Sequence, residues 1–276
     1  MQKLNAGVSD FFHWHVILLT VNWAVLTQEW WRFNLRAPHW RLYWHDRDGA
    51  MLDVAGVPHP LRARRVYLIP ADTAGRAATA DGVGQFYCHF TVLGLPAFTM
   101  RDLFDPVTAV PGCPWIDETA AELAAAAATD APFGPAEECR VNALIFAAMA
   151  QALMAASPER LARYAHTSAH LQPVLPALGY IEAHYTEPIT LEQLAEQCNL
   201  TPVYFGRRFQ HCTGMTPIRY LQETRVKMAM RHLAFTDHSI EAIAAATGFG
   251  TRAYFTRIFT RHAGTSPAAY RKALRT

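Results

Sequence analysis

The sequence has few charged residues, few cysteines and no long hydrophobic run. Charged residues make up 17% of its 276 residues and hydrophobic residues 51%, which is typical of a globular protein and excludes a disordered chain. The five cysteines form no CxxC pair, so we expect free thiols and no disulfide framework. The apolar stretch from Val16 to Leu26 is broken by Asn22 and is too short to span a bilayer, and no signal-peptide layout opens the chain. These absences predict a soluble, cytoplasmic protein.

Charge is distributed unevenly along the chain. Lys and Arg number 13 before Leu171 and 12 from there on, whereas Asp and Glu number 16 and 7. The formal charge of +2 therefore combines −3 in the first 170 residues with +5 in the last 106. A basic C-terminal third on a mildly acidic body predicts a module that binds a polyanion.

The first part of the chain predicts a β-rich domain followed by helices. Aromatic and branched residues cluster at 40–44, 65–70 and 85–90 between Gly- and Pro-rich turns, and this spacing predicts a sandwich or small barrel over residues 1–116. Residues 117–156 predict a helical segment whose stretch 139–156 is apolar at helical spacing. That stretch fits a dimer seam, or packing against its own β domain. Residues 157–172 are predicted to be the linker, so the expected fold class is α+β, with an all-α domain at 173–276.

The all-α domain carries explicit helix start signals. Thr190 and Gln193 form a capping box, and hydroxyl residues precede proline at three further helix starts. The predicted start positions after Thr190 are Thr201, Thr216, Ser239, Thr251 and Ser266.

An internal repeat is the most informative feature. At an offset of 50, eight residues of the first copy recur as identities in the second. They are Thr201, Tyr204, Phe205, Arg207, Phe209, Gly214, Pro217 and Tyr220, repeated as Thr251, Tyr254, Phe255, Arg257, Phe259, Gly264, Pro267 and Tyr270.

Each copy predicts a helix-turn-helix: unit one at about 190–213 and unit two at about 239–263, joined by a helix over 217–234. The turn holds Asn199 or Gly248, which tolerate a left-handed backbone. Paired phenylalanines four residues apart place one face of each second helix in the core. The opposite face, with Arg207 in unit one and Arg257 in unit two, is polar, basic and short enough to enter a DNA major groove.

These residues resemble the AraC/XylS family of bacterial transcription regulators over about Val174 to Leu274, most clearly in unit two from Ile243-Ala244 to Tyr270-Arg271. The resemblance implies a seven-helix domain whose two second helices read base edges in double-stranded DNA. It further implies a nucleoid-associated homodimer that acts with RNA polymerase, and neither an enzyme activity nor a cofactor. By position, the base-reading residues are Val203, Gly206, Arg207, Arg252, Ala253 and Arg257. The phosphate contacts are assigned to Thr201, Thr251, Lys227 and Gln210.

The N-terminal part resembles, more loosely, the cupin-like effector domain common in that family, which is often associated with carbohydrate use. Six of the seven tryptophans lie in the first 44 residues, beside histidines and arginines that would suit a sugar or another small polar effector. The predicted effector-binding residues are Trp40, Arg41, Tyr43, His45 and His89.

Two other classes of protein remain open. A metal-dependent cupin enzyme is suggested by Gly7 followed by His13 and His15, but the glutamate and the second motif that such a site needs are missing, so no metal is expected. A helical interaction scaffold would bind neither DNA nor metal.

Overall fold

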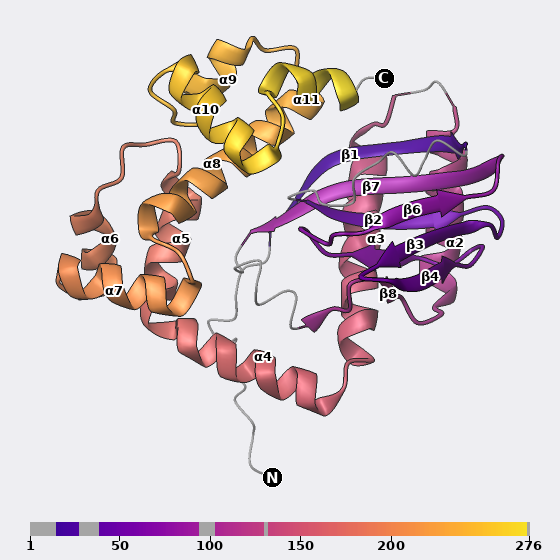
Figure 1. Cartoon of the computed structure of the whole chain (residues 1–276), viewed down its shortest axis with the longest axis horizontal. Coiled ribbons are helices and arrows are strands. Elements are labelled where there is room, and N and C mark those ends of the chain that lie inside the picture. Colours follow the sequence, from indigo (N-terminus) through magenta and orange to yellow (C-terminus); the bar gives the residue numbers. More distant parts are fainter. Residues whose placement is uncertain (1–14, 28–38, 94–102, 130–131, 275–276) are drawn as a thin grey trace.

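The computed structural model of the protein describes residues 15–27, 39–93, 103–129 and 132–274 (Figure 1). A strand-rich domain occupies one half and a purely helical domain the other, and the long helix α4 runs between them along one side. The strands are β1 (His15–Leu26), β2 (Trp40–His45), β3 (Ala50–Val54), β4 (Val57–Leu61), β5 (Tyr67–Ile69), β6 (Arg76–Thr79), β7 (Val83–Leu93) and β8 (Thr108–Ala109). The first helices are α2 (Pro114–Ala127), α3 (Pro135–Met154) and α4 (Pro158–Leu171).

The strands form two antiparallel sheets. One has five strands in the order β1-β7-β2-β5-β8 and the other three in the order β4-β3-β6. The three predicted strand regions are confirmed as β2, β5 and β7. The expected barrel is not closed among the described residues, because their strands divide into two separate sheets. The β-rich domain is therefore confirmed, but not a cupin barrel.

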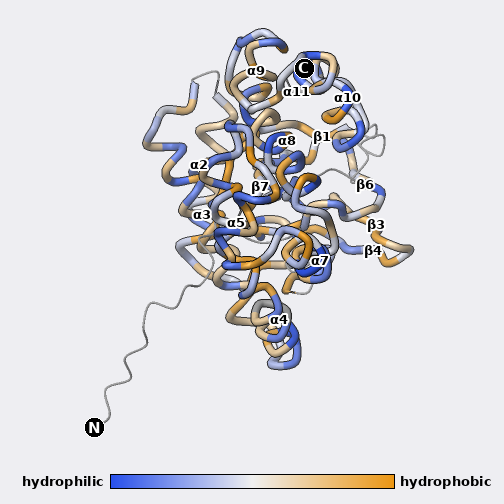
Figure 2. Tube along the Cα trace, turned by 90° about the vertical axis from the view of Figure 1, so that its left-hand side faces the viewer, coloured by the Kyte–Doolittle hydropathy of each residue, from blue (hydrophilic) through white to orange (hydrophobic). Residues whose placement is uncertain are grey.

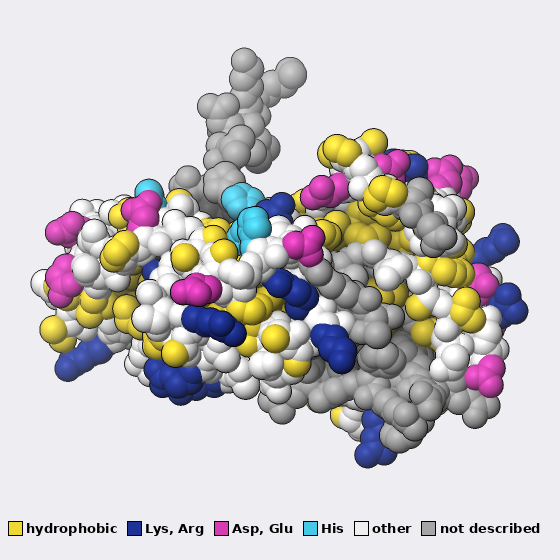
Figure 3. Space-filling view, turned by 90° about the horizontal axis from the view of Figure 1, so that it is seen from above, with side chains coloured by type: hydrophobic (Ala, Val, Ile, Leu, Met, Phe, Trp, Pro, Cys, Tyr) yellow, Lys and Arg dark blue, Asp and Glu magenta, His cyan; other side chains and the backbone are white. Residues whose placement is uncertain are grey.

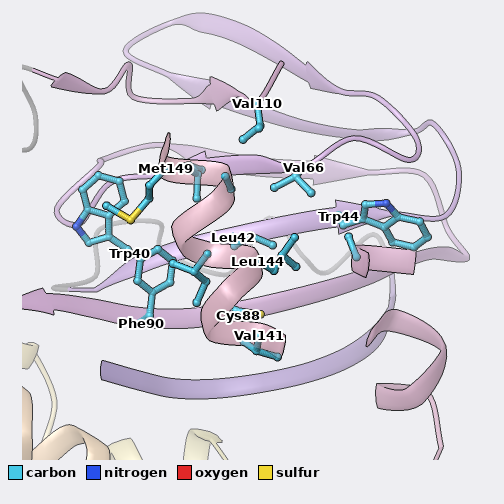
Figure 4. Close-up of a cluster of buried hydrophobic side chains, with 14 of the residues drawn as sticks. Trp40, Leu42, Trp44, Val66, Cys88, Phe90, Val110, Val141, Leu144 and Met149 are labelled. Carbon is cyan, nitrogen blue, oxygen red and sulfur yellow. The ribbon is translucent and has the colours of Figure 1, made fainter. Parts of the chain in front are cut away.

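The five-stranded sheet separates two environments. Side chains alternate across a strand, so Trp40, Leu42 and Trp44 of β2 lie on one face, together with Cys88 and Phe90 of β7. Helices α2 and α3 cover that face and complete its hydrophobic core (Figure 4). The opposite face turns toward the three-stranded sheet.

Helix α3 packs on its own domain. Its six buried residues, Val141, Leu144, Ile145, Ala148, Met149 and Ala152, face the five-stranded sheet. Burying side chains of this kind stabilises the fold by about 1.5–3 kcal/mol each for the larger ones. Residues 139–156 were open to two roles, a dimer seam or packing on their own β domain. The apolar stripe packs on its own domain, so any dimer seam must use the other face of α3.

The predicted linker is a helix. Residues 157–172 are polar and rich in histidine, yet Ser157 caps α4 by accepting a hydrogen bond from the Arg160 amide, and Pro158 occupies its first turn. The Arg160 guanidinium donates to the Asp105 carboxylate at 2.5 Å, which ties the start of α4 to the strand-rich domain. The two domains are thus joined by a helix.

The C-terminal domain consists of seven helices in the described residues, as the resemblance implies. They are α5 (Leu175–His184), α6 (Leu191–Gln197), α7 (Pro202–Thr213), α8 (Pro217–Phe235), α9 (Ile240–Ala246), α10 (Arg252–Ala263) and α11 (Pro267–Leu274), after a short 3₁₀ turn η2 (Gln172–Val174). The Thr190 capping box forms, and Thr216, Ser239, Thr251 and Ser266 each accept a backbone amide. The prediction is wrong in one detail: Thr201 precedes α7, but its hydroxyl makes no capping bond.

The two domains share a hydrophobic core. A register shift between Leu18 and Thr20 of β1 marks a bulge at Leu19, and the side chains of Ile17 and Leu19 point away from the α2–α3 side. These two side chains pack with α8 residues, including Val226 and Met230, in the cluster that also contains the core of unit two. The strand-rich domain therefore supports unit two directly.

Candidate nucleic-acid interface

Each helix-turn-helix unit buries one face of its second helix. Phe205 and Phe209 of α7 are fully buried with ring centroids 5.5 Å apart, and Phe255 and Phe259 of α10 repeat this arrangement at 5.5 Å. The turn residues have the left-handed backbone that the sequence predicts, with φ of 53° at Asn199 and 77° at Gly248. The repeat is thus a structural duplication, and α7 and α10 are equivalent reading helices.

The opposite faces of these helices are exposed. In α10, Arg252, Ala253 and Arg257 lie on the surface, and they line an open concavity of about 790 Å³ together with Thr256, Thr260 and Arg261. In α7, Val203 is 68% exposed, Arg207 and Gln210 are exposed, and Gly206 is half-buried. Both predicted arginines therefore point away from the core.

The two reading helices are held apart by α8. Figures 1 and 2 both place α10 above α7 with α8 between them. The predicted stripe of α8, made by Leu221, Val226, Met230 and Leu233, is buried, so the helix is packed along its length.

Hydrogen bonds connect α8 to the segment that follows α5, just before unit one. Arg225 of α8 donates from Nε to the Tyr185 carbonyl at 2.6 Å and from Nη2 to the Glu187 carbonyl at 2.7 Å. A Cβ at Gly248 would lie 2.7 Å from the Tyr185 carbonyl oxygen, so only glycine allows the turn of unit two to approach α5 this closely. The glycine in the sequence predicts a left-handed turn here, but it does not indicate this close approach to α5.

The surface around unit two is positively charged. Burial lowers the pKa of His262, and the nearby Arg219, Arg261 and Lys227 lower it further, while Glu223 opposes them. Seen from above, Lys and Arg side chains gather along the lower edge of the helical half (Figure 3). A positive potential of this kind favours the phosphate backbone of DNA.

The predicted phosphate contacts occupy different environments. Thr201 and Thr251 are exposed at the N-termini of the reading helices, where backbone amides favour phosphate oxygens. Thr251 also caps α10 by accepting from the Tyr254 amide at 3.2 Å. Lys227 is half-buried on α8, next to the reading helix of unit two and not on it.

Four of the five predicted effector residues lie together. Arg41, Tyr43 and His45 of β2 pair in register with His89, Tyr87 and Gln85 of β7, and these six residues form what we call the polar wall, on the sheet face away from α2 and α3. Trp40 is the exception, because strand alternation turns it to the opposite face, where its ring packs 5.1 Å from Phe104. The sequence missed Gln85 and Tyr87, although alternation along 85–90 was the signal for them.

Four residues of the polar wall are buried, and Tyr87 and His89 are half-buried. Burial lowers the pKa of His45 to about 4 and that of His89 to about 3, with Arg41 lowering the latter further, so both imidazoles are neutral at pH 7. His39 lies 4.6 Å from His89 between ring centroids, and burial also lowers its pKa well below the usual range. Among the described residues, Nδ1 of His39 and Nδ1 of His89 have no hydrogen-bond partner. Such groups favour a polar guest, because leaving them unpaired costs free energy.

The alternative metal site is not assembled by the described residues. His13 lies outside them, and in the described ranges no group of three or more His, Cys, Asp or Glu side chains could hold a metal ion.

No single described helix combines the length and apolarity to cross a bilayer. One consecutive pair, Pro135–Met154 with Pro158–His184, meets that test only jointly and is bent by 109°.

Comparisons with known proteins agree with this geometry. The family described as a helix-turn-helix domain matches residues 194–273. The transcriptional activator and DNA repair enzyme AdaA of Bacillus subtilis is 36% identical over 93 residues, which are 34% of this chain and 44% of AdaA. The MmsAB operon regulatory protein of Pseudomonas aeruginosa is 34% identical over 97 residues, 35% of this chain and 32% of that protein. This chain thus spans less than half the length of these relatives.

Solved structures extend the likeness. The DNA-binding domain of AdpA, in complex with a target DNA, is 34% identical and covers 37% of this chain and 93% of its own, with a TM-score of 0.36. An apo variant of ToxT from Vibrio cholerae strain SCE256 covers 95% of this chain and 97% of its own at 11% identity, with a TM-score of 0.50. That likeness concerns the fold alone, and it includes both domains.

The fold and the exposed reading helices define a double helix-turn-helix protein. The helix-turn-helix domain of this chain is similar to that of AraC/XylS transcription regulators, as the resemblance implies. The region shared with AdaA is the helix-turn-helix domain, and not a repair domain.

Proposed function

We propose that the protein is a sequence-specific transcription regulator that binds double-stranded DNA through α7 and α10 and responds to a small effector in its strand-rich domain. One observation carries the first part: the duplicated units bury their phenylalanines and expose Arg207 and Arg257 at equivalent positions. Arginine is the side chain that most often reads guanine in the major groove.

The proposal is tested by selecting binding sites from random duplexes with the full-length protein. Affinity for the selected duplex should fall steeply with salt, because phosphate contacts release counterions. Arg257→Ala should cost about 1–3 kcal/mol and relax the preference at one base pair. Lys227→Ala is the matched control, and it should weaken binding to all sequences alike. If no sequence is enriched, or if both variants bind like the parent protein, the assigned surface is wrong.

The polar wall supports an effector site. It places the guanidinium of Arg41, the hydroxyls of Tyr43 and Tyr87 and two neutral imidazoles on one buried face, a donor and acceptor set suited to a sugar or related polyol. Trp40 is not part of this proposal, because it faces the helices.

A thermal-shift screen of sugars and related metabolites against the whole protein would identify the effector. A compound that raises the melting temperature should lose its effect in Arg41→Gln and in His89→Gln, and keep it in Trp40→Phe, which changes the opposite face. A shift that survives both polar-wall variants would place the effector elsewhere.

The dimer is proposed to form through the outer face of α3. Phe146 is 41% exposed there, whereas Ile145 and Met149 are buried in the core of their own domain. Phe146→Glu should therefore reduce a dimeric mass in sedimentation equilibrium to that of a monomer while the protein remains folded. A dimer that survives this change would exclude α3 as the seam.

A further inference from the structure

Arg257 of α10 stacks on an aromatic ring of its own helix. Its guanidinium carbon lies 5.2 Å from the centroid of the Tyr254 ring, within the range of a cation–π interaction. The two residues are three positions apart on α10, so their side chains are neighbours on the helix surface. The stacking fixes a long side chain that is otherwise exposed.

Tyr254 is itself anchored. Its hydroxyl accepts a hydrogen bond from Gln222 Nε2 of α8 at 2.6 Å, and its ring lies 6.0 Å from that of Phe249 between centroids. The tyrosine is half-buried against the core of unit two. Arg257 therefore stacks on a ring that is fixed at both its edge and its hydroxyl.

Unit one offers an internal comparison. Tyr204 occupies the position of Tyr254, but its side chain is 55% exposed. In the described part of the chain, Tyr204 has no hydrogen bond to α8, and Arg207 has no comparable stacking contact. The same pair of residue types is thus ordered in unit two and unrestrained in unit one.

This difference has an energetic consequence for recognition. A free arginine loses rotamer entropy when it binds a base, whereas one already fixed loses less. We propose that Tyr254 is a positioning residue that presets Arg257 for its base pair, so that unit two discriminates sequence more sharply than unit one. This inference rests on the proposed function, since it concerns the same DNA-reading surface.

The test uses the full-length protein and its selected duplex. The Arg257 position is defined as the base pair whose preference is lost in Arg257→Ala, and the ratio of dissociation constants for wrong and preferred base pairs is measured there. Tyr254→Leu should lower this ratio by about two- to fivefold, as expected for an exposed cation–π contact. Tyr254→Phe keeps the ring and should restore most of the ratio. Affinity for unrelated DNA should remain that of the parent protein in both variants, while loss of the hydrogen bond from Gln222 should lower the melting temperature of Tyr254→Phe slightly.

Two controls separate positioning from a general structural effect. Tyr204→Leu should leave the ratio at the Arg257 position unchanged. In the Arg257→Ala background, Tyr254→Leu should not change the ratio further. The proposal is overturned if Tyr254→Leu leaves the ratio unchanged while Arg257→Ala abolishes it, or if Tyr254→Leu tightens binding, which would mean that stacking withholds the arginine from DNA.

A measurement on the unmodified protein covers the case in which Tyr254→Leu does not fold. Relaxation of the arginine side-chain Nε groups by NMR, without DNA, should find Arg257 ordered and Arg207 mobile on the nanosecond timescale. Equal mobility of the two would overturn the proposal. Failure of the proposed function gives a different result from failure of this inference. If the protein does not read DNA sequence, the parent protein has no base-pair preference that Arg257→Ala could remove.

Discussion

The two helix-turn-helix units share a skeleton and differ in what surrounds it. Both bury two phenylalanines of the reading helix and have a left-handed turn residue. Unit one packs its core on α5, η2 and the start of α8, whereas unit two packs on the rest of α8 and on Ile17 and Leu19 of β1. Duplication therefore preserved the residues that make the fold, while the contacts of unit two connect it to the strand-rich domain.

The contact between the domains also brings α11, which follows unit two, near the polar wall. Burial against the helical domain raises the pKa of Tyr270 of α11, and the charge of Arg41 in the polar wall acts electrostatically on that phenol. Unit one, by contrast, connects to the strand-rich domain through α4, whose start is held by the contact of Arg160 with Asp105.

The largest expected effect concerns the shared core. Leu19→Ala removes a side chain that is 1% exposed and should cost about 2–5 kcal/mol of packing free energy. Hydrogen exchange read by mass spectrometry should find amides of α8–α10 losing more protection than those of α6–α7. If both units lose protection equally, the contact with β1 does not distinguish them.

A smaller effect is expected at the turns. Gly248→Ala places a side chain at φ 77° against the Tyr185 carbonyl, and should cost about 2 kcal/mol or more from strain and crowding together. Asn199→Ala meets only the conformational cost of φ 53°, about 1 kcal/mol. Chemical denaturation of both variants measures the difference, and equal losses would mean that the tie to α5 carries no strain.

The smallest effect concerns the start of the reading helices. Thr251→Ala deletes a capping hydrogen bond and should destabilise the protein by about 1 kcal/mol, within the usual range for such caps. Thr201→Ala should change stability little, because that hydroxyl caps nothing. Thermal unfolding of the pair tests this, with a comparable loss in Thr201→Ala as the contradicting result.

Local patterns predicted much of the helical domain. The repeat, the capping residues and the turn residues could all be predicted from the sequence, because helix starts and left-handed turns depend on the few residues around them. The Thr201 hydroxyl accepts no capping hydrogen bond, although Thr201 precedes a proline as Thr216 does, and nothing in the surrounding residues explains this.

Prediction of the strand-rich domain was less complete. Strand β1 coincides with an apolar run whose alternation is interrupted by the bulge after Leu18, so no period of two was visible there. The polar, histidine-containing composition of 157–172 predicts a linker, although Leu161, Tyr164 and Leu171 recur at helical spacing in what the structure forms as a helix. Trp40 and Arg41 are adjacent in sequence, and only the pairing of β2 with β7 assigns them to opposite faces.

The sequence by itself determined that the C-terminal domain is helical, where six of its helices begin, their duplication and the exposed arginines, since these follow from periodicity and from residue chemistry over a few turns. The tertiary structure alone decided which unit contacts the strand-rich domain, which arginine stacks on a tyrosine and which face of each strand is polar. Those outcomes depend on contacts between residues far apart in the chain, and such contacts leave no local pattern.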